Sequence, residues 1–227
     1  MKNKIIIISV LILANCISCQ MGEKKSQFNF DFEQVSNNFP VGWEKGIGDG
    51  AACYKNNYDV YLDSAIRKNG KYSAVIEYKE GAPSFQSLAF ELPNNYEGEQ
   101  IILTGYIKTE DVTDGHAGLW MRIDPQVAFD NMKERGIVGT TDWTKYEVSL
   151  QMNPNETRQI VIGALLAGKG KMWIDNLTVT IDGEDITNAK IIKKPTNRTS
   201  FRRNKKATPL ITFEGYLHSF VKISVVS

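Results

Sequence analysis

The stretch AGLWMRID, at residues 117–124, alternates between two kinds of side chain. Successive side chains of a β-strand point to opposite faces, so its leucine, methionine and isoleucine share one face. Trp120, Arg122 and Asp124 share the other face. The alternation predicts a strand whose apolar face lies in a core, and it leaves open what the second face does.

Runs of similar character recur along the chain and are separated by glycine, asparagine and aspartate. The runs are FNFDFE (28–33), GAACYK (50–55), YDVYLD (58–63), SAVIEYK (73–79), SLAFELP (87–93), EQIILTGYIKTE (99–110), KYEVSLQM (145–152), RQIVIGALLAG (158–168) and KMWIDNLTVTID (171–182). None has the periodicity of a helix of three turns, and a spacing of about ten residues is typical of sandwiches. We therefore expect an all-β fold over residues 28–187: a two-sheet antiparallel β-sandwich of the jelly-roll type.

Residues 1–19 have the pattern of an export signal. Two lysines precede the apolar run IIIISVLILA (5–14), which has signal-peptide length and is too short to span a bilayer. Cys19 suits the cleavage site of a bacterial lipoprotein signal better than Cys16, because a small serine precedes it. We expect Cys19 to carry lipid and residues 20–27 to tether the domain to the outer membrane of a bacterial cell envelope, on its periplasmic or surface face. The alternative is an ordinary secretory signal.

The formal net charge of +1 conceals a segregation of charge. Residues 19–187 are rich in aspartate and glutamate, which argues against nucleic acid as a partner. In residues 188–227, Glu214 is the one acid among many lysines and arginines. We expect this basic tail to be disordered. Three interpretations stay open: a solvated tail, a segment that binds anionic lipid or polysaccharide, or the product of a truncated or frame-shifted gene.

Catalytic motifs are absent from the sequence. Neither G-x-S-x-G, nor HExxH, nor a phosphate-binding loop occurs. If Cys19 is lipidated and Cys16 is removed, Cys53 is the remaining thiol, and no internal disulfide is expected. Cys53 and His116 would make a nucleophile–base pair, but a single cysteine in an apolar strand is more typical of packing. We therefore expect a protein that is not an enzyme.

Several stretches resemble one family when taken in order. They are FDFEQ…FPVGW, YLDSAIRKNGKYSAVIEY, ILTGYIKTEDVTDGHAGLWMRID, GTTDWTKYEVSL and GKGKMWIDNLTVTIDG. Together they resemble the galactose-binding-like jelly roll of many carbohydrate-binding modules. More closely, they resemble the accessory jelly roll that precedes the peptidase in some bacterial exported S41-type serine proteases. The resemblance covers residues 28–187, and the peptidase portion, with its serine and lysine, has no counterpart.

With the export signal and Cys19, which predict a membrane anchor, the resemblance implies an anchored, non-catalytic binding module with a glycan as its partner. The alternative is an accessory domain of a truncated S41-type serine peptidase, which would dock a peptidase domain or bind a protein substrate. The superfamily also contains purely structural members, so the fold by itself does not assign a ligand.

The outward face of the strands is the expected sugar site. A sugar ring stacks on an aromatic side chain while neighbouring polar groups bind its hydroxyls. With Ile107 inward, the stretch GYIKTE would point two further side chains outward, beside the first strand if the two are neighbours. The expected ligand-binding residues are Trp120, Arg122, Asp124, Tyr106 and Lys108, with Asp130 and Asn131 from the long connection at 124–143. The alternative is a structural face, or an interface with a peptidase domain, in which Arg122 lies over Trp120 and pairs with Asp124.

Carbohydrate-binding jelly rolls of this type often hold a calcium ion that ties the first strand to the last. The resemblance places its carboxylates at Glu33 and Asp175, with Asp31 on the same strand face, and its backbone carbonyls around Lys68 and Gly70. Calcium takes about six to eight oxygen ligands, and a bound ion stabilises the folded state. The alternative is that backbone amides or a lysine cap the two carboxylates.

Overall fold

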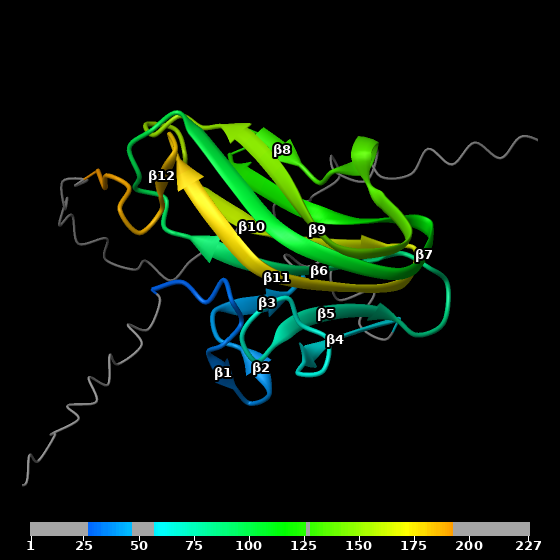
Figure 1. Cartoon of the computed structure of the whole chain (residues 1–227). Coiled ribbons are helices and arrows are strands. Elements are labelled where there is room, and N and C mark those ends of the chain that lie inside the picture. The colour runs from blue at the N-terminus through cyan, green and yellow to red at the C-terminus, as the bar shows by residue number, and fades with distance from the viewer. Residues whose placement is uncertain (1–26, 47–56, 126–127, 193–227) are drawn as a thin grey trace, which may run out of the picture. The chain divides into compact units, whose positions relative to one another are not determined.

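The computed structural model describes residues 27–46, 57–125 and 128–192, all of which belong to one structural unit (Figure 1). Within these ranges the regular structure is almost entirely β, as the sequence predicts. No helix in the described part of the chain has the length and apolar character needed to cross a membrane. The predicted signal segment, its Cys19, the lone Cys53 and most of the basic tail lie outside the described residues.

Twelve strands and one short turn of 3-10 helix make up the described structure. They are β1 (Val35–Ser36), β2 (Phe39–Pro40), β3 (Trp43–Lys45), β4 (Tyr58–Asp63), β5 (Ser73–Tyr78), β6 (Phe85–Leu92), β7 (Gln100–Asp124), β8 (Ala128–Asp130), η2 (Lys133–Arg135), β9 (Ile137–Gln151), β10 (Gln159–Ala167), β11 (Lys169–Ile181) and β12 (Glu184–Asp185).

Strand β7 is long enough to belong to both layers of the sandwich. Its first half pairs with β11 and β9, and its second half pairs with β10 and β8. One layer therefore has the order β4-β5-β11-β7-β9, and the other has the order β3-β6-β10-β7-β8, with antiparallel pairing throughout. Figure 1 shows β7, β9 and β11 as long, curved strands that run beside one another.

The apolar face of AGLWMRID lies in the core, as predicted. Leu119, Met121 and Ile123 are each 0% exposed, and so are Leu103 and Ile107 from the first half of β7. Burying side chains of this size stabilises the fold by about 1.5–3 kcal/mol each relative to leaving them in water. The two halves of β7 thus supply the core from both layers.

Aromatic side chains of the N-terminal segment pack against this core beside β3 and β6. The rings of Phe28 and Phe30 are stacked, with centroids 5.1 Å apart and planes 9° apart, and both meet Phe90 edge-on. Trp43 packs against Phe90 at 5.3 Å and donates its indole N–H to the carbonyl of Asn29 at 2.8 Å. The segment is thereby fixed along the edge of the sandwich.

Strand β11 contains a bulge between Asp175 and Thr178. Asn176, inside the bulge, has a φ of 50°, in the left-handed region of backbone conformation. Strand β5 pairs with β11 only at residues 171–174, before the bulge. Beyond it the N-terminal segment approaches β11, and the Leu177 N–H donates to the carbonyl of Phe30 at 3.0 Å.

The domain extends a few residues beyond the predicted boundary at 187. Ile191 forms a β-bridge with Tyr96, and the Glu97 N–H donates to the carbonyl of Lys190 at 2.8 Å. The expectation of disorder from residue 188 onward is therefore wrong for residues 188–192. Ile191 and Ile192 pair with residues 95 and 96, although the basic composition of the tail predicts no regular structure.

Candidate ligand-binding site

Trp120 and Arg122 lie on the outer surface of the β3-β6-β10-β7-β8 layer, away from the main core. Residues directly opposite each other in antiparallel strands share a face. Trp120 lies opposite Gly163 of β10, and Arg122 lies opposite Val161. Trp120 packs in a small cluster separate from the main core, whose buried members are Ala89, Trp120, Val161 and Leu165.

The indole of Trp120 is only 5% exposed. Gly163 makes room for it, because a Cβ at Gly163 would lie 2.7 Å from the indole Nε1 and 2.0 Å from the carbonyl oxygen of Leu88. Among the residues that the structure describes, the Trp120 Nε1 has no hydrogen-bond partner. A buried donor without an acceptor costs about 1–3 kcal/mol. Because the N–H is itself buried, a ligand oxygen would reach it and supply the missing bond only if the indole moved.

Arg122 and Asp124 form an ion pair on the same face, with Nε and Oδ2 2.9 Å apart. Both side chains are partly buried, and the pair fixes the orientation of the planar guanidinium. The pairing of Arg122 with Asp124 is one of the two contacts of the structural alternative. The other, Arg122 over the Trp120 ring, is not among the cation–π contacts of the described residues. The ion pair is equally compatible with binding, because an oriented guanidinium is a better donor to a ligand than a mobile one.

Strand β8 adds an aromatic side chain that the sequence analysis missed. Phe129 lies opposite Arg122 and is 50% exposed. It was missed because residues 124–143 read as a connection, and only strand alternation would have shown which way Phe129 points. We call the outer surface formed by Trp120, Arg122, Asp124 and Phe129 the Trp120 face.

Asp130 and Asn131, the two residues expected at the rim, are held by local contacts. Asp130 forms an ion pair with Arg135 at 2.7 Å and accepts the Met132 N–H at 2.8 Å. Burial raises the pKa of Asp130, but these two partners outweigh burial and lower it overall. Asn131 accepts the Lys133 N–H with its side chain at 3.2 Å. The two residues therefore shape the turn after β8.

Tyr106 and Lys108 do not join this surface. The two stretches that were treated as neighbouring strands are two parts of the single strand β7, and they pair with different partners. Tyr106 lies between Lys145 of β9 and Asp175 of β11, and Lys108 pairs with the exposed Asp142 at 3.3 Å. The seven predicted residues are thus divided between the two layers.

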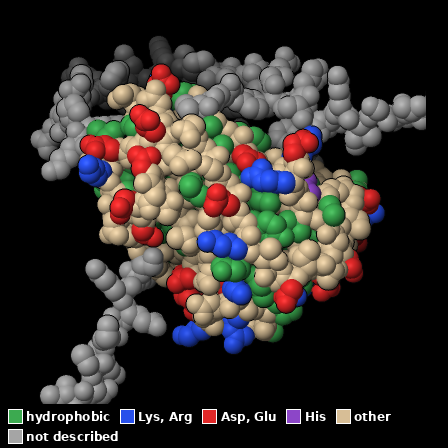
Figure 2. Space-filling view, turned by 45° about the horizontal axis from the view of Figure 1, so that its top comes forward, with side chains coloured by type: hydrophobic (Ala, Val, Ile, Leu, Met, Phe, Trp, Pro, Cys, Tyr) green, Lys and Arg blue, Asp and Glu red, His purple; other side chains and the backbone are tan. Residues whose placement is uncertain are grey.

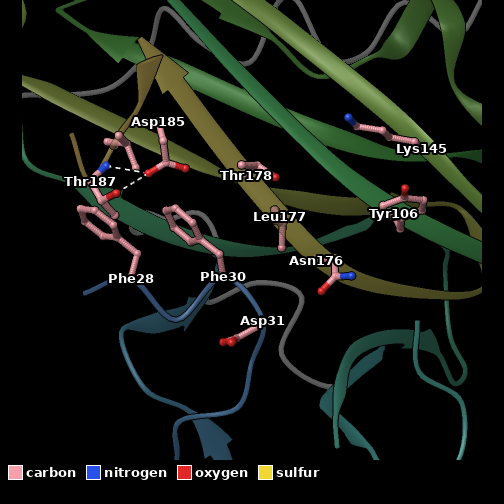
Figure 3. Close-up of a pocket in the computed structure, with 11 residues that line it drawn as sticks. Phe28, Phe30, Asp31, Tyr106, Lys145, Asn176, Leu177, Thr178, Asp185 and Thr187 are labelled. Atoms are coloured by element: carbon pink, nitrogen blue, oxygen red, sulfur yellow. Dashed lines mark hydrogen bonds between the residues drawn. The ribbon is translucent and has the colours of Figure 1, made fainter. Parts of the chain in front are cut away.

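Tyr106 instead lines a groove of about 450 Å³ along β11, which we call the Tyr106 groove (Figure 3). Its lining residues are Phe28, Phe30, Asp31, Tyr106, Lys145, Asn176, Leu177, Thr178, Asp185, Ile186 and Thr187. Figure 3 shows Tyr106 and Lys145 on one side of β11 and the two phenylalanines on the other. The sequence could not reveal this groove, since its lining comes from five separate segments.

Asp175 and Glu33, the proposed calcium ligands, both contact the turn at residues 64–72. One oxygen of Asp175 accepts the N–H groups of Lys68 and Asn69, each at 2.9 Å. One oxygen of Glu33 accepts the N–H groups of residues 71 and 72, at 2.6 and 3.1 Å. Burial raises the pKa of the Asp175 carboxyl. The N–H groups of Lys68 and Asn69 act to lower this pKa, and the charge of Glu33 acts to raise it further.

The hydrogen bonds from the turn to Asp175 and Glu33 are the ones expected if backbone amides, rather than calcium, bind the two carboxylates. The described contacts bring N–H groups of the turn to the carboxylates, and the Gly70 carbonyl accepts the Arg67 Nε–H at 2.9 Å. Asp31 receives one long bond, from the Glu33 N–H at 3.4 Å, and lies at the groove. Within the described ranges, no group of three or more histidine, cysteine, aspartate or glutamate side chains is placed to hold a metal ion. The calcium site stays a prediction.

Comparison with known proteins finds distant similarities. No family model matches the chain. The chain is 30% identical over 148 residues to a Bacillus subtilis protein described as the uncharacterized HTH-type transcriptional regulator YbfP. The match covers 63% of this chain and 45% of that protein, so this chain spans less than half the length of its curated relative.

The solved structures that resemble this chain include carbohydrate-binding modules. The CBM22-1 xylan-binding domain of Paenibacillus barcinonensis Xyn10C is 13% identical, with a TM-score of 0.46 over 67% of this chain and 91% of that one. A family 16 carbohydrate-binding module is 12% identical, with a TM-score of 0.46 over 67% and 99%. TmCBM61, solved with β-1,4-galactotriose, is 16% identical, with a TM-score of 0.41 over 67% and 95%. At these values the likeness does not say what this chain binds.

Proposed function

We propose that this chain is a non-catalytic carbohydrate-binding module, exported and anchored by lipid at Cys19, and that it binds a glycan on the Trp120 face. One observation carries the proposal. A buried indole N–H without an acceptor, an arginine oriented by an ion pair and an exposed phenylalanine ring lie side by side on one sheet surface.

Each of these groups suits a different part of a sugar. The ring of Phe129 offers an apolar surface for the C–H face of a pyranose. Arg122 donates hydrogen bonds to sugar oxygens, and Asp124 accepts from hydroxyl groups. The Trp120 N–H would donate to a hydroxyl that reached the cluster. A sugar hydroxyl both donates and accepts hydrogen bonds. A glycan therefore matches the combination of an apolar ring, donors and an acceptor on this face better than a purely apolar or purely anionic ligand does.

Binding is better supported than catalysis. On the proposed face, Asp124 is engaged by Arg122. His116 is half-buried, its Nε2 lies 3.3 Å from the carbonyl of Asn131, and burial lowers the pKa of its ring. Among the described residues its hydrogen-bond partner is therefore a backbone carbonyl. These contacts favour a module that holds a ligand without transforming it.

The 148-residue match, at 30% identity, to part of a protein described as an HTH-type regulator is consistent with a module that occurs in different proteins. The alternative, an accessory domain of a truncated S41-type peptidase, would use the same exposed Phe129 to contact protein. No described contact favours a protein partner over a glycan, so this alternative is an outcome of the test below.

Calcium is a separate proposal. Glu33 and Asp175 act on each other electrostatically, and that interaction contributes to the raised pKa of Asp175. A divalent cation between two carboxylates removes their repulsion and supplies a link between the first segment and β11. For calcium to bind there, the turn at residues 64–72 would have to rotate some of its N–H groups away from the two carboxylates and present its carbonyl oxygens to the ion instead.

The direct test is affinity electrophoresis of the full chain through gels that contain xylan, β-glucan or β-1,4-galactan. We expect retardation in at least one gel and its loss in Arg122→Ala and Phe129→Ala. Arg135→Ala is the matched control, because it removes a similar arginine–aspartate pair at the turn after β8. Val138→Ala, which trims an exposed apolar residue of β9, controls for Phe129→Ala. Unretarded migration in every gel would refute the proposal and leave the protein-docking alternative.

A further inference from the structure

The Tyr106 groove is separate from the Trp120 face, because it lies on the other layer of the sandwich. Its floor is the segment of β11 at residues 176–178, after the bulge. The hollow is a product of the fold: β5 stops pairing before the bulge, and the N-terminal segment lies along β11 beyond it. Figure 2 shows one face of the molecule, on which charged side chains of both signs are interspersed with apolar ones.

Aromatic rings line the groove from two segments. Phe28 and Phe30 are stacked on each other and braced edge-on by Phe90, so their position is fixed. Tyr106 lies across the floor from them and is partly exposed (Figure 3). The Nζ of Lys68 lies 4.7 Å from the centre of the Tyr106 ring, which steadies that side chain. A rigid aromatic lining is what a sugar ring requires for stacking.

Polar groups of both kinds lie between the rings. Lys145 and Asn176 are donors, and among the described residues neither side chain has an ion pair or hydrogen bond. Asp31 is an acceptor whose one described bond, from the Glu33 N–H, is long at 3.4 Å. Asp185 is already engaged, since its Oδ1 accepts from the hydroxyl and the N–H of Thr187. The groove therefore offers two unused donors and an acceptor, Asp31, with capacity for further hydrogen bonds.

We propose that the Tyr106 groove is a second binding site, for a neutral saccharide of one or two rings. Its volume of about 450 Å³ lies in the range of small-ligand sites. Lysine and aspartate both line the groove, so it lacks the one-signed field that a charged ligand would require. The polar groups of Lys145, Asn176 and Asp31 have capacity for further hydrogen bonds, which disfavours a purely apolar ligand. A saccharide donates to the carboxylate, accepts from the lysine and the amide, and stacks on the rings.

The test is saturation-transfer difference NMR of the full chain with cellobiose, xylobiose and lactose. We expect transfer to at least one disaccharide. Asn176→Gly is the sharpest variant, because it removes the amide side chain while glycine adopts the left-handed backbone easily. Losing one hydrogen bond predicts a Kd raised by about tenfold. Tyr106→Ala should abolish transfer, and Tyr106→Phe, which keeps the ring, should retain most of it.

The site does not depend on the proposed function of the Trp120 face, and the same experiment separates the two. Transfer that persists in Arg122→Ala, requires about tenfold more disaccharide in Asn176→Gly and fails in Tyr106→Ala supports the groove whatever the Trp120 face does. Transfer that fails in Arg122→Ala but is unchanged in both groove variants refutes the groove and leaves the Trp120 face intact. Absence of transfer to all three disaccharides also refutes the groove. Thermal unfolding of each variant confirms that it is folded.

Discussion

Gly163→Ala tests the packing under the Trp120 face. Gly163 lies in the middle of β10, which pairs with β6 on one side and with β7 on the other. An added Cβ would lie 2.0 Å from the carbonyl oxygen of Leu88 and 2.7 Å from the Trp120 Nε1. The first neighbour is backbone and cannot rotate away, so β10 and β6 must separate locally and the indole must move.

The expected loss of stability follows from these contacts. Overpacking a filled site costs about 1–3 kcal/mol, and each hydrogen bond of the ladder that is broken costs about 1 kcal/mol more. Replacing glycine by alanine within a strand returns roughly 0.5–1 kcal/mol. With one bond broken, the net loss is about 1–3.5 kcal/mol, which lowers the Tm of a domain of this size by roughly 2–14 °C.

Thermal and urea unfolding followed by circular dichroism measure this loss. Gly105→Ala is the matched control, because Gly105 also lies within a strand and its added Cβ would meet the side chains of Leu177 and Leu119 at 3.3 and 3.4 Å. Those side chains can give way, so we expect its loss to stay below about 1 kcal/mol. Equal stability of Gly163→Ala and the unchanged chain would refute the described packing of Trp120 on Gly163.

Three further predictions concern buried or paired polar groups. Tyr58→Phe removes a buried hydroxyl that donates to the Gly168 carbonyl at 2.6 Å and accepts the Ser84 N–H at 3.0 Å. Urea unfolding should show that the free energy of unfolding falls by about 1–3 kcal/mol. An unchanged midpoint would contradict these two bonds. The pKa of Asp130 is lowered overall, although burial acts in the opposite direction. The ion pair of Asp130 therefore stabilises the fold fully above the unfolded-state pKa of about 3.9. This stabilisation is lost as the pH falls through the folded-state pKa. The difference in Tm between the unchanged chain and Arg135→Gln should therefore shrink between neutral pH and pH ~3, and a constant difference would disprove the pairing. If calcium binds at Glu33 and Asp175, added calcium should raise the Tm and a chelator should lower it; a Tm that ignores both would leave the amide-capped turn as the whole explanation.

The core was predictable because alternation is a local property. The odd positions of residues 117–124 are apolar in the sequence, and all four side chains are fully buried in the structure. Alternation also predicted that Trp120 faces away from the main core. It could not predict that the indole is covered, because its neighbours Val161, Leu165 and Ala89 come from strands that are distant in sequence.

The continuity of β7 was not predictable from turn signals. Asp111 and Asp114 both adopt the left-handed backbone that is typical of turns, with φ of 50° and 59°. Here they are irregularities within a strand that continues to pair, as Val112 does with Gly139. Local residue preference and long-range pairing disagree at this point, and pairing decides the structure.

The candidate site was predicted only in part, because alternation relates residues of one stretch and not residues of different strands. Trp120, Arg122 and Asp124 come from one stretch, and alternation places them together. Phe129 reaches the face only through the register of β8 with β7, which the sequence does not reveal. The Tyr106 groove depends on a bulge in β11 and on where the N-terminal segment lies, and neither is encoded by a local pattern.

The indole N–H signals of the four tryptophans give the most direct test of the central claim. Trp43 donates to the carbonyl of Asn29 and Trp173 to Asp63, whereas the Trp120 N–H has no partner in the described part of the chain. In a ¹H–¹⁵N spectrum, with the Trp120 signal assigned through Trp120→Phe, we would titrate xylohexaose and β-1,4-galactotriose. We predict that one of them shifts the Trp120 signal downfield, as a new hydrogen bond requires, and leaves those of Trp43 and Trp173 in place. A Trp120 signal that stays fixed while a glycan saturates the protein, or that responds to neither glycan, would contradict the account.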